Sequence, residues 1–289
     1  MPAKEVLISL KNVGFTYNRG LPTECAALFD ISLDIVRGEI ISLIGHTGSG
    51  KSTLIQLLNS QRMPDCGEIR WHMDGVCDEK GLPVRRRVCA AVGLVFQYPE
   101  DQVFEETVYE DIAFGPRQLG KTPEETEKIV FRTAELMGLD KQILYKTPFE
   151  LSGGTLRKVA IAGVLAMEPR VLVLDEPMAG LDPKSCDGFA SLLLGLRECL
   201  GLSIVMVSHN LEYSAALSDK IYCMSGGRIV LSGTAREVFS DRAKLDEHAI
   251  GVIPAASVAA ELAASGMKIE KTPLTAEELA GEILNNYGK

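Results

Sequence analysis

Residues 40–52 read Ile-Ile-Ser-Leu-Ile-Gly-His-Thr-Gly-Ser-Gly-Lys-Ser, and no other segment is as informative about the fold. The unbroken apolar run Ile40–Ile44 is typical of a strand that is covered on both faces of a parallel sheet. The following residues fit the P-loop pattern, and a helical run, Thr53–Leu58, comes next. A strand, a glycine-rich turn and a helix in this order predict a site where backbone N–H groups surround a phosphate.

The P-loop pattern also predicts roles for side chains. We expect Lys51 to reach the β- and γ-phosphates of a nucleotide and Ser52 to ligate Mg²⁺. A glycine-rich turn with an incidental lysine is the alternative, and the correct flanking elements disfavour it. His46 occupies a variable position that is typical of an exposed filler. The remaining residues expected to contact the nucleotide are Gly45, His46, Thr47, Gly48, Ser49, Gly50 and Thr53.

A second buried run ends in two acids. Val171–Leu174 precedes Asp175 and Glu176, and ligands bind at the carboxyl ends of the strands in parallel sheets. We expect Asp175 to hold the Mg²⁺ shell and Glu176 to orient the attacking water or take its proton. An Asp-Glu pair alone is more typical of a solvated turn, but a P-loop in the same chain favours the catalytic interpretation.

The remaining patterns predict an α/β fold with a mixed sheet as its core. Residues 6–17 and 29–36 are rich in β-branched and aromatic types, which indicates an antiparallel β subdomain. Ser203–Val207 is a further short apolar run and predicts another buried strand.

Two helical parts are expected in addition to the sheet. Thr122-Pro123-Glu124-Glu125 predicts a capped helix that runs to about Gly138, within an inserted helical subdomain at about residues 98–168. The composition then shifts after Gly233, with helices expected between Pro254 and Gly266 and from a cap at Thr275. The predicted division is a nucleotide-binding domain at 1–239 and a small C-terminal helical extension at 240–289.

The tetrapeptide Leu151-Ser152-Gly153-Gly154 opens a helical run at 157–166. It predicts a second helix N-terminus that can hold an anion, and two such sites for one nucleotide point to a partner molecule. Ser-Gly-Gly alone is a common turn, but its position between the P-loop and the Asp-Glu pair makes the chain resemble the ATP-binding-cassette (ABC) family. The resemblance implies a head-to-tail dimer, in which Ser152, Gly153 and Gly154 belong to the contact with the nucleotide of the other chain.

The same resemblance implies roles for four further residues. Gln97 corresponds to the Q-loop glutamine, which contacts Mg²⁺ or water, and Asp182 lies in the D-loop near the dimer interface. His209 corresponds to the switch histidine that contacts the γ-phosphate. Tyr17 resembles the aromatic residue that stacks on adenine, with Phe15 as the competing candidate. The implied catalytic residues are Glu176, His209, Lys51 and Gln97.

One position departs from the family pattern. Many relatives have Gln after Ser-Gly-Gly, whereas this chain has Thr155. We expect a reduced but not absent contribution of this motif to hydrolysis. If the chain pairs with a non-identical ATPase, the two nucleotide sites of the dimer could therefore differ in rate.

Within the family, residues 96–104, 111–116 and 159–167 look like the ATPases of energy-coupling factor (ECF) transporters. The segment 17–28 is similar to the second of the two ATPase types in ECF modules for vitamins. The resemblance implies an ATPase that powers uptake of a micronutrient. The implied partners are a second, non-identical ABC ATPase, a transmembrane coupling protein that docks near residues 97–104, and membrane substrate-binding subunits. The C-terminal extension would be a dimerisation region.

Composition limits the alternatives. The 289 residues carry 30 Lys+Arg against 39 Asp+Glu, a net charge of −9, which disfavours a nucleic-acid partner. Seven cysteines without a CxxC pair are typical of reduced cytoplasmic thiols. No stretch reaches the ~18 apolar residues of a membrane span, and the first residues lack a signal-peptide core. We expect a peripheral protein at the cytoplasmic face of the cell membrane.

Two other functions stay open at this stage. A single-ATPase cobalt or nickel module of the same superfamily would use the chain as a homodimer. A soluble ABC ATPase of DNA repair or translation is disfavoured, because residues 52–151 contain no sustained heptads and the chain has one cassette.

Overall fold

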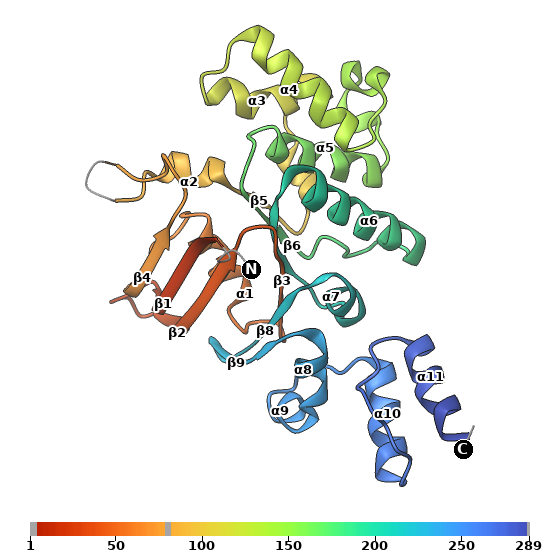
Figure 1. Ribbon diagram of the computed structural model, residues 1–289. Helices are drawn as coiled ribbons and strands as arrows, with labels where there is room; N and C mark the ends of the chain where they lie inside the picture. Colours follow the sequence, from red (N-terminus) through yellow and green to blue (C-terminus); the bar gives the residue numbers. More distant parts are fainter. Residues whose placement is uncertain (1–4, 79–81, 288–289) are drawn as a thin grey trace.

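A computed structural model describes residues 5–78 and 82–287 as two β-sheets with helices around them (Figure 1). The larger sheet has the strand order β5-β6-β7-β3-β8-β9, and the smaller sheet has the order β2-β1-β4. The strands are β1 (Val6–Tyr17), β2 (Cys25–Val36), β3 (Ile40–Ile44), β4 (Cys66–Trp71), β5 (Val92–Val95), β6 (Val171–Asp175), β7 (Ser203–Val207), β8 (Lys220–Ser225) and β9 (Arg228–Gly233).

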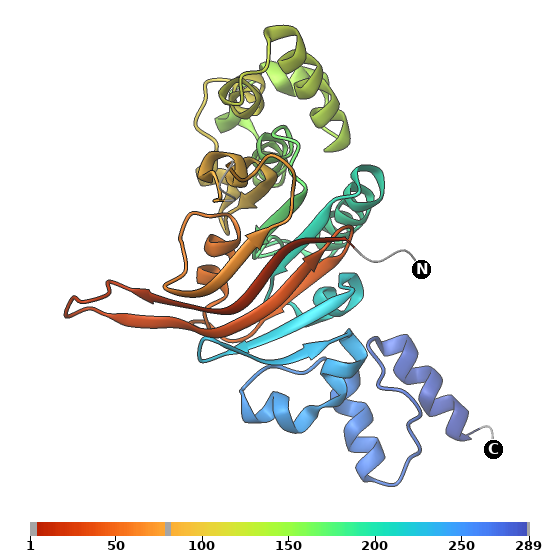
Figure 2. The same cartoon turned by 60° about the vertical axis from the view of Figure 1, so that its left-hand side comes forward.

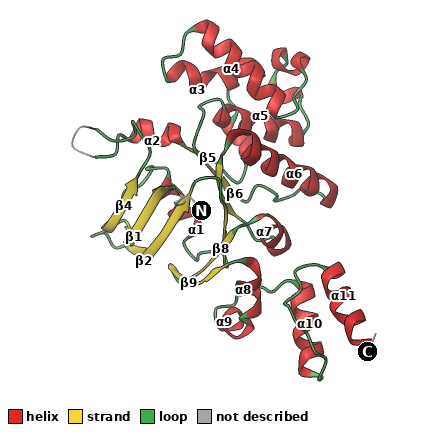
Figure 3. Cartoon of the chain, viewed as in Figure 1, coloured by secondary structure: helices red, strands yellow, loops and turns green. Residues whose placement is uncertain are grey.

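Helices cover the larger sheet and extend beyond it at two opposite ends (Figure 3). In the described part of the chain, no helix combines the length and the apolar character needed to cross a bilayer. The α-helices are α1 (Lys51–Leu58), α2 (Arg85–Ala91), α3 (Val108–Gln118), α4 (Pro123–Leu136), α5 (Gly153–Leu165), α6 (Pro183–Leu200), α7 (Leu211–Leu217), α8 (Ala235–Ser240), α9 (Arg242–Glu247), α10 (Pro254–Ala264) and α11 (Ala276–Tyr287), and the 3₁₀ turns are η1 (Pro99–Gln102), η2 (Lys141–Tyr145) and η3 (Pro148–Glu150).

The larger sheet is parallel except at one edge. β3 pairs in parallel with β7 and β8, β6 pairs in parallel with β5 and β7, and β9 runs antiparallel to β8. The three short apolar runs predicted as buried strands are confirmed as β3, β6 and β7. Because parallel strands point the same way, Gly45 after β3, Asp175 at the end of β6 and His209 after β7 lie at the same edge of the sheet.

The smaller sheet is built on a long hairpin of β1 and β2, which extends away from the rest of the molecule (Figure 2). Its register runs from Val6 opposite Val36 to Tyr17 opposite Cys25. β2 therefore starts earlier than the predicted strand at 29–36, because pairing with β1 keeps the preceding residues extended. β4, which the sequence analysis did not predict, pairs antiparallel with the other side of β1.

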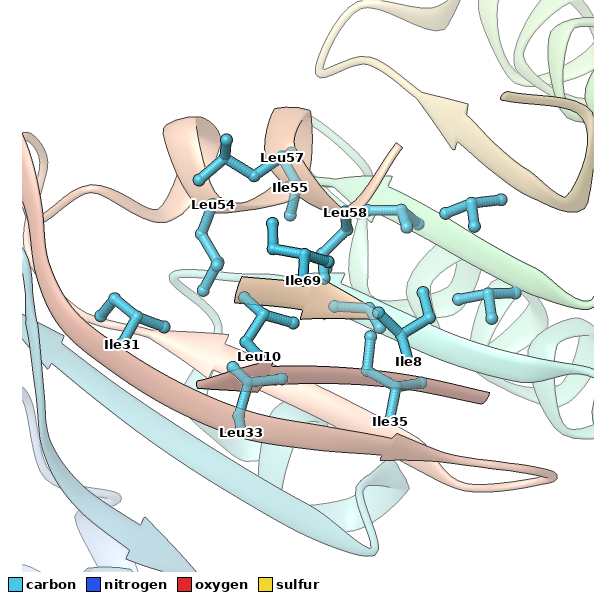
Figure 4. Packing of buried hydrophobic residues seen from close by; sticks show 14 of the residues in the cluster. Ile8, Leu10, Ile31, Leu33, Ile35, Leu54, Ile55, Leu57, Leu58 and Ile69 are labelled. Atoms are coloured by element: carbon cyan, nitrogen blue, oxygen red, sulfur yellow. The ribbon is translucent and has the colours of Figure 1, made fainter. Parts of the chain in front are cut away.

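The apolar side of α1 packs on the smaller sheet (Figure 4). Ile8 and Leu10 from β1, Ile31 from β2, and Leu54 and Leu58 from α1 are each at most 2% exposed. Burying such a side chain stabilises a fold by about 1.5–3 kcal/mol. This cluster anchors α1, and it thereby holds the loop between β3 and α1 at the edge of the larger sheet.

The inserted segment forms a helical layer of α3, α4 and α5 at one end of the molecule (Figure 1). The predicted capping box is confirmed, since the Glu125 N–H donates to the Thr122 hydroxyl and the Glu125 carboxylate accepts the Thr122 N–H. The helix N-terminus predicted at Leu151–Gly154 is confirmed, and α5 already begins at Gly153, before the helical run expected at 157–166. The Ser152 side chain caps the helix by accepting the N–H of the third residue after it.

The C-terminal segment forms the opposite end of the molecule (Figure 2). The two predicted helices are confirmed as α10 and α11, and the Thr275 hydroxyl accepts the Glu278 N–H at 3.2 Å. One buried cluster contains Ile221 of β8, Phe239 of α8 and Leu245 of α9. Apolar contacts therefore continue across residues 239 and 240, where the sequence analysis divides the chain.

Candidate active site

The loop between β3 and α1 depends on its glycines, as Gly45 and Gly48 illustrate. Gly45 has a φ of +150°, and a Cβ there would lie 2.1 Å from the carbonyl oxygen of Met224 in β8. Gly48 has a φ of +82° with open space around it, a backbone conformation that glycine adopts without a steric cost. The start of the loop therefore packs closely against β8, whereas its turn at Gly48 has open space around it.

Lys51, the first residue of α1, extends back along this loop. Its Nζ donates hydrogen bonds to the carbonyl oxygens of Gly45 at 2.7 Å and His46 at 3.0 Å. Burial lowers the pKa of Lys51, and the carboxylates of Glu176 and Asp175 act in the opposite direction. The lysine thus lies between the loop and the two acids that end β6.

The loop, α1 and the strand ends surround a cleft of about 570 Å³, within the range of ~300–1,000 Å³ that small-molecule sites have. Gly45, His46 and Ser49 belong to the loop but do not line the cleft, and the exposed His46 ring contacts the Thr47 carbonyl instead. The expected site residues that line it are Tyr17, Thr47, Gly48, Gly50, Lys51, Ser52, Thr53, Gln97, Asp175, Glu176 and His209.

Three of these residues offer oxygen ligands. Burial raises the pKa of Asp175, and the hydrogen bond that its carboxylate accepts from the Ser52 hydroxyl opposes this effect. Gln97, which follows β5, lines the same cleft as both. Mg²⁺ prefers oxygen ligands and often takes one or two carboxylates together with phosphates and water. The donor set of Ser52, Gln97 and Asp175 fits this preference.

Glu176 and His209 approach each other from the ends of β6 and β7. Glu176 Oε2 accepts a hydrogen bond from the His209 backbone N–H at 3.1 Å. Glu176 Oε1 lies 3.2 Å from His209 Nε2, but in the described residues it is buried without a hydrogen bond of normal geometry. Burial raises the pKa of Glu176, and the His209 backbone hydrogen bond opposes this. A buried carboxylate with a free acceptor oxygen is suited to taking a proton.

The structure distinguishes the two aromatic candidates for base stacking. Phe15 is 8% exposed and lies in the core, whereas Tyr17 is half-buried and lines the cleft. The Tyr17 hydroxyl lies 2.9 Å from Thr53 Oγ1, and the guanidinium carbon of Arg62 lies 4.6 Å from the centre of the Tyr17 ring. These two contacts fix the orientation of the ring at the cleft.

Part of the cleft wall carries no sequence motif. Cys25, Ala26 and Ala27 at the start of β2, and Gly226 and Gly227 in the turn between β8 and β9, also line it. The first three arrive through the hairpin register, in which Cys25 lies opposite Tyr17. No motif marks these positions, and only the strand pairing could have revealed them.

The signature residues lie away from this cleft. Ser152 and Gly154 line a separate cavity of about 720 Å³, which Leu181 and Ser185 also line. Asp182 caps α6, because its carboxylate accepts the backbone N–H of Ser185 at 3.1 Å. Of the residues that line the nucleotide-sized cleft, none comes from 152–154 or is Asp182.

The Thr155 side chain contacts the signature serine directly. Its Oγ1 lies 2.9 Å from Ser152 Oγ, and its N–H donates to the same oxygen. The Ser152 hydroxyl therefore already has a partner within its own helix.

A shallow groove adjoins the cleft at Gln97. It has a volume of about 550 Å³, and Gln97 and Asp175 line both it and the cleft. The side chain of Gln102 shapes the groove, because its Oε1 accepts the Phe96 N–H at 3.0 Å. The exposed aromatic side chains of Phe96 and Tyr98 line the groove. Phe104 and Phe114 are also exposed and contact each other.

A P-loop at the end of one parallel strand and an Asp-Glu pair at the end of another define the class of P-loop nucleotide-binding proteins. The family model described as ABC transporter matches residues 28–179. This chain belongs to the ABC transporter family, in its group of ATP-binding subunits.

The chain is similar to named relatives over almost its whole length. It is 43% identical over 279 residues to the energy-coupling factor transporter ATP-binding protein EcfA2 of Streptococcus pyogenes serotype M5 (strain Manfredo), which covers 96% of this chain and 99% of the relative. The EcfA2 of serotype M1 of the same species matches with the same identity and coverage.

Solved structures show the same fold. CbiO1 from Clostridium perfringens, described as part of the ABC transporter complex CbiONQ, has a TM-score of 0.73 and 32% identity, covering 84% of this chain and 94% of that one. The cassette MJ0796, in a dimeric post-hydrolysis state with ADP and phosphate, has a TM-score of 0.66 and 28% identity, covering 79% and 99%.

Proposed function

We propose that this chain is the ATP-hydrolysing subunit of an ECF-type importer. The observation that carries the proposal is the cleft itself, where Lys51, Asp175, Glu176 and His209 gather beside the P-loop. Full-length similarity to EcfA2 supports the importer assignment. The reaction is hydrolysis of ATP to ADP and phosphate, and its energy is used by membrane subunits.

ATP would bind with its base at Tyr17 and its phosphates over the P-loop. The backbone N–H groups at the start of α1 and the helix dipole favour the negative charge of the phosphates. Lys51 exchanges its loop carbonyl partners for β- and γ-phosphate oxygens, which places a positive charge where negative charge develops. When bound, Mg²⁺ would be held by Ser52, Gln97 and Asp175 and would neutralise charge on the phosphates.

Glu176 is the proposed general base. The residue lines the cleft, and its buried Oε1 makes no hydrogen bond of normal geometry, so Oε1 can accept a proton from the attacking water while Oε2 stays fixed by the His209 N–H. The His209 imidazole is more than half exposed, so it can turn toward a γ-phosphate oxygen. The two residues thus divide the work between proton transfer and charge stabilisation.

The signature motif would act on a second subunit. Ser152 and Gly154 lie in a cavity of their own and not in the cleft of the same chain, so they are available to a nucleotide that another subunit holds. The dimeric state of MJ0796 supports this arrangement. We propose that the dimer is a heterodimer with a non-identical ABC ATPase, and that residues 240–289 contribute to dimerisation. Because Thr155 engages Ser152, the signature of this chain is expected to be the weaker of the two.

The groove at Gln97 is the proposed dock for a transmembrane coupling protein. Phe104 is 62% exposed and stacks edge-on with Phe114 at 5.0 Å. Exposed aromatic clusters are typical of protein interfaces. Since Gln97 lines both groove and cleft, a change of the bound nucleotide would alter the contacts of a helix in the groove.

The chain would then lie at the cytoplasmic face of the membrane, in a complex that also contains membrane substrate-binding subunits. Vitamins are the proposed substrate class.

A second candidate is the ATPase of a cobalt or nickel importer that works as a homodimer. The observation in its favour is the similarity to CbiO1, which is described as part of the CbiONQ complex.

The test is mass spectrometry of the proteins that copurify with the tagged chain from gently solubilised native membranes. A second cassette ATPase, one coupling protein and several small membrane proteins would support the vitamin-type module. A homodimer with metal-transport subunits would select the second candidate. If no membrane protein copurifies and ATP is not hydrolysed, both candidates fail.

A further inference from the structure

One arginine joins the signature helix to the segment that follows Glu176. Arg157 lies in the first turns of α5, and its guanidinium donates hydrogen bonds to the carbonyl oxygens of Pro177 at 2.9 Å and Ala179 at 3.1 Å. A planar guanidinium with fixed donors can hold two carbonyls at once, which an ammonium group cannot do with the same geometry. Arg157 therefore fixes both ends of the Pro177–Ala179 segment relative to α5.

The residue just before the segment held by Arg157 is strained. Glu176 has a φ of +49°, a left-handed conformation that is uncommon for a residue with a side chain. Its backbone N–H donates to the Val207 carbonyl and its carbonyl accepts the Ala179 N–H, each at 3.0 Å. Such a conformation persists only where the surrounding structure over-determines it. The bonds from Arg157 are part of that surrounding structure.

The backbone conformation of Glu176 decides where its carboxylate lies. Oε2 meets the His209 N–H at 3.1 Å, and Oε1 stays buried without a normal hydrogen bond. If the carbonyls of Pro177 and Ala179 lost their donor, the turn could relax toward an unstrained conformation, because part-buried carbonyls seek other partners. The Glu176 carboxylate would then leave its place beside His209.

We propose that Arg157 is a positioning residue that holds Glu176 in its catalytic conformation, and this rests on the proposed role of Glu176 as base. Ser152 and Arg157 lie on the same helix, α5. A displacement of the signature end of α5 is therefore transmitted through the Arg157 guanidinium to the base of the same chain. In a dimer, this connects the contact with the partner's nucleotide to the chain's own hydrolysis site.

The test uses the full-length chain in the membrane complex that copurifies with it. Arg157→Gln is expected to lower kcat for ATP hydrolysis by about 10- to 100-fold, the size of effect that a small displacement of a catalytic group has. The KM for ATP is expected to stay within about twofold, since Arg157 does not line the cleft. The kcat of Arg157→Lys should lie between those of the unmodified chain and Arg157→Gln, because lysine keeps the charge but cannot keep both hydrogen bonds.

Two comparisons separate positioning from a general structural role. In a Glu176→Gln background, Arg157→Gln should cause no further loss of the residual rate, because the carboxylate that Arg157 is proposed to position is already absent. The matched control is Arg132→Gln in α4, whose guanidinium binds the exposed Glu168 at 2.5 Å, and it should hydrolyse ATP like the unmodified complex.

Three results would overturn the proposal. The first is an unchanged kcat in Arg157→Gln, and the second is a rise in its KM for ATP as large as the fall in its kcat. The third is a double variant whose rate falls by the product of the losses in Arg157→Gln and Glu176→Gln. If Arg157→Gln does not fold, the same comparisons are made with Arg157→Lys. Failure of the proposed function is distinct, since the unmodified complex would then hydrolyse no ATP.

Discussion

Glu176 Oε1 lies 3.2 Å from His209 Nε2, although the two residues are separated by a helix and a strand along the chain. β6 and β7 are adjacent parallel strands, so the residues after them meet at one edge of the sheet. The backbone of His209 also binds the other oxygen of the carboxylate. This double contact brings the ends of two separate strands together, and it is the basis of the first prediction.

Glu176→Gln is expected to lower kcat for ATP hydrolysis by about 10²- to 10⁴-fold, the usual contribution of a general base. ATP affinity should be retained, because the amide keeps the shape of the side chain and Lys51 stays in place. The rate of phosphate release measures kcat, and equilibrium binding of ATP measures the affinity. Glu198→Gln, on the exposed side of α6, is the control. Hydrolysis at the unmodified rate in the Glu176 variant would refute the assignment of the base.

Lys51→Ala is expected to weaken ATP binding by about 10- to 100-fold, since hydrogen bonds to charged groups contribute about 1.5–3 kcal/mol each. The variant also loses the bonds to the carbonyls of Gly45 and His46, so its thermal stability is measured in parallel. Isothermal titration with ATP gives the affinity. Lys128→Ala removes an exposed lysine of α4 and should leave binding unchanged. Equal affinity in the two variants would exclude Lys51 from the phosphate site.

Tyr17→Ala is expected to reduce the affinity for ATP and ADP by about 2- to 12-fold, which corresponds to a stacking contribution of about 0.5–1.5 kcal/mol. Tyr17→Phe keeps the ring and loses only the contact with Thr53, so it should bind almost normally. Inorganic tripolyphosphate has no base and serves as the control ligand. If its binding falls as much as that of ATP, Tyr17 does not act through stacking.

Gly45→Ala is expected to lower the free energy of unfolding by about 1–3 kcal/mol or more, because the new Cβ would lie 2.1 Å from the Met224 carbonyl oxygen. Gly188→Ala in α6 is the matched control, since nothing lies within 4 Å of its added Cβ. It should stabilise the helix by about 0.5–1 kcal/mol. Urea unfolding of both variants measures the difference, and a Gly45 variant as stable as the parent would contradict the structure of the loop.

Asp111 is expected to make stability depend on pH. Burial raises its pKa above 3.8, while hydrogen bonds from the Phe104 and Glu105 N–H groups oppose this. The folded chain then binds the proton more tightly than the unfolded chain, so the free energy of unfolding falls as pH rises from 3.8 through the raised value and stays lower above it. Asp111→Asn keeps the acceptor oxygen and carries no charge, so this loss should disappear.

Thermal unfolding between about pH 4 and pH 7 measures the effect of Asp111→Asn. At pH 7 the variant should melt at the same temperature as the parent or higher. Asp34→Asn changes an exposed carboxylate of β2 and serves as the control. An Asp111 variant with the pH dependence of the parent would show that this carboxylate does not cause it.

Much of the fold follows from short-range patterns. The run Ile40–Ile44 predicts β3 because an unbroken apolar strand needs cover on both faces, and Thr122 with Glu125 predicts the start of α4 through a local exchange of hydrogen bonds. The early start of β2 could not be predicted, since Cys25–Leu28 is extended only because β1 lies beside it. The helix N-terminus predicted at Leu151–Gly154 is confirmed, because the Ser152 side chain caps α5 and the helix includes both glycines.

The sequence by itself determined the chemistry of the site. Lys51 and Ser52 follow β3 through the P-loop, and Asp175 and Glu176 stand at the end of β6. A pattern of a few residues was sufficient to propose their roles. Tertiary structure decided which groups meet. Strand register placed Tyr17 and not Phe15 at the cleft.

Helix packing brought the Arg157 guanidinium to the carbonyls behind Glu176. Contacts between residues distant along the chain depend on the packing of whole elements, and no local pattern specifies that packing.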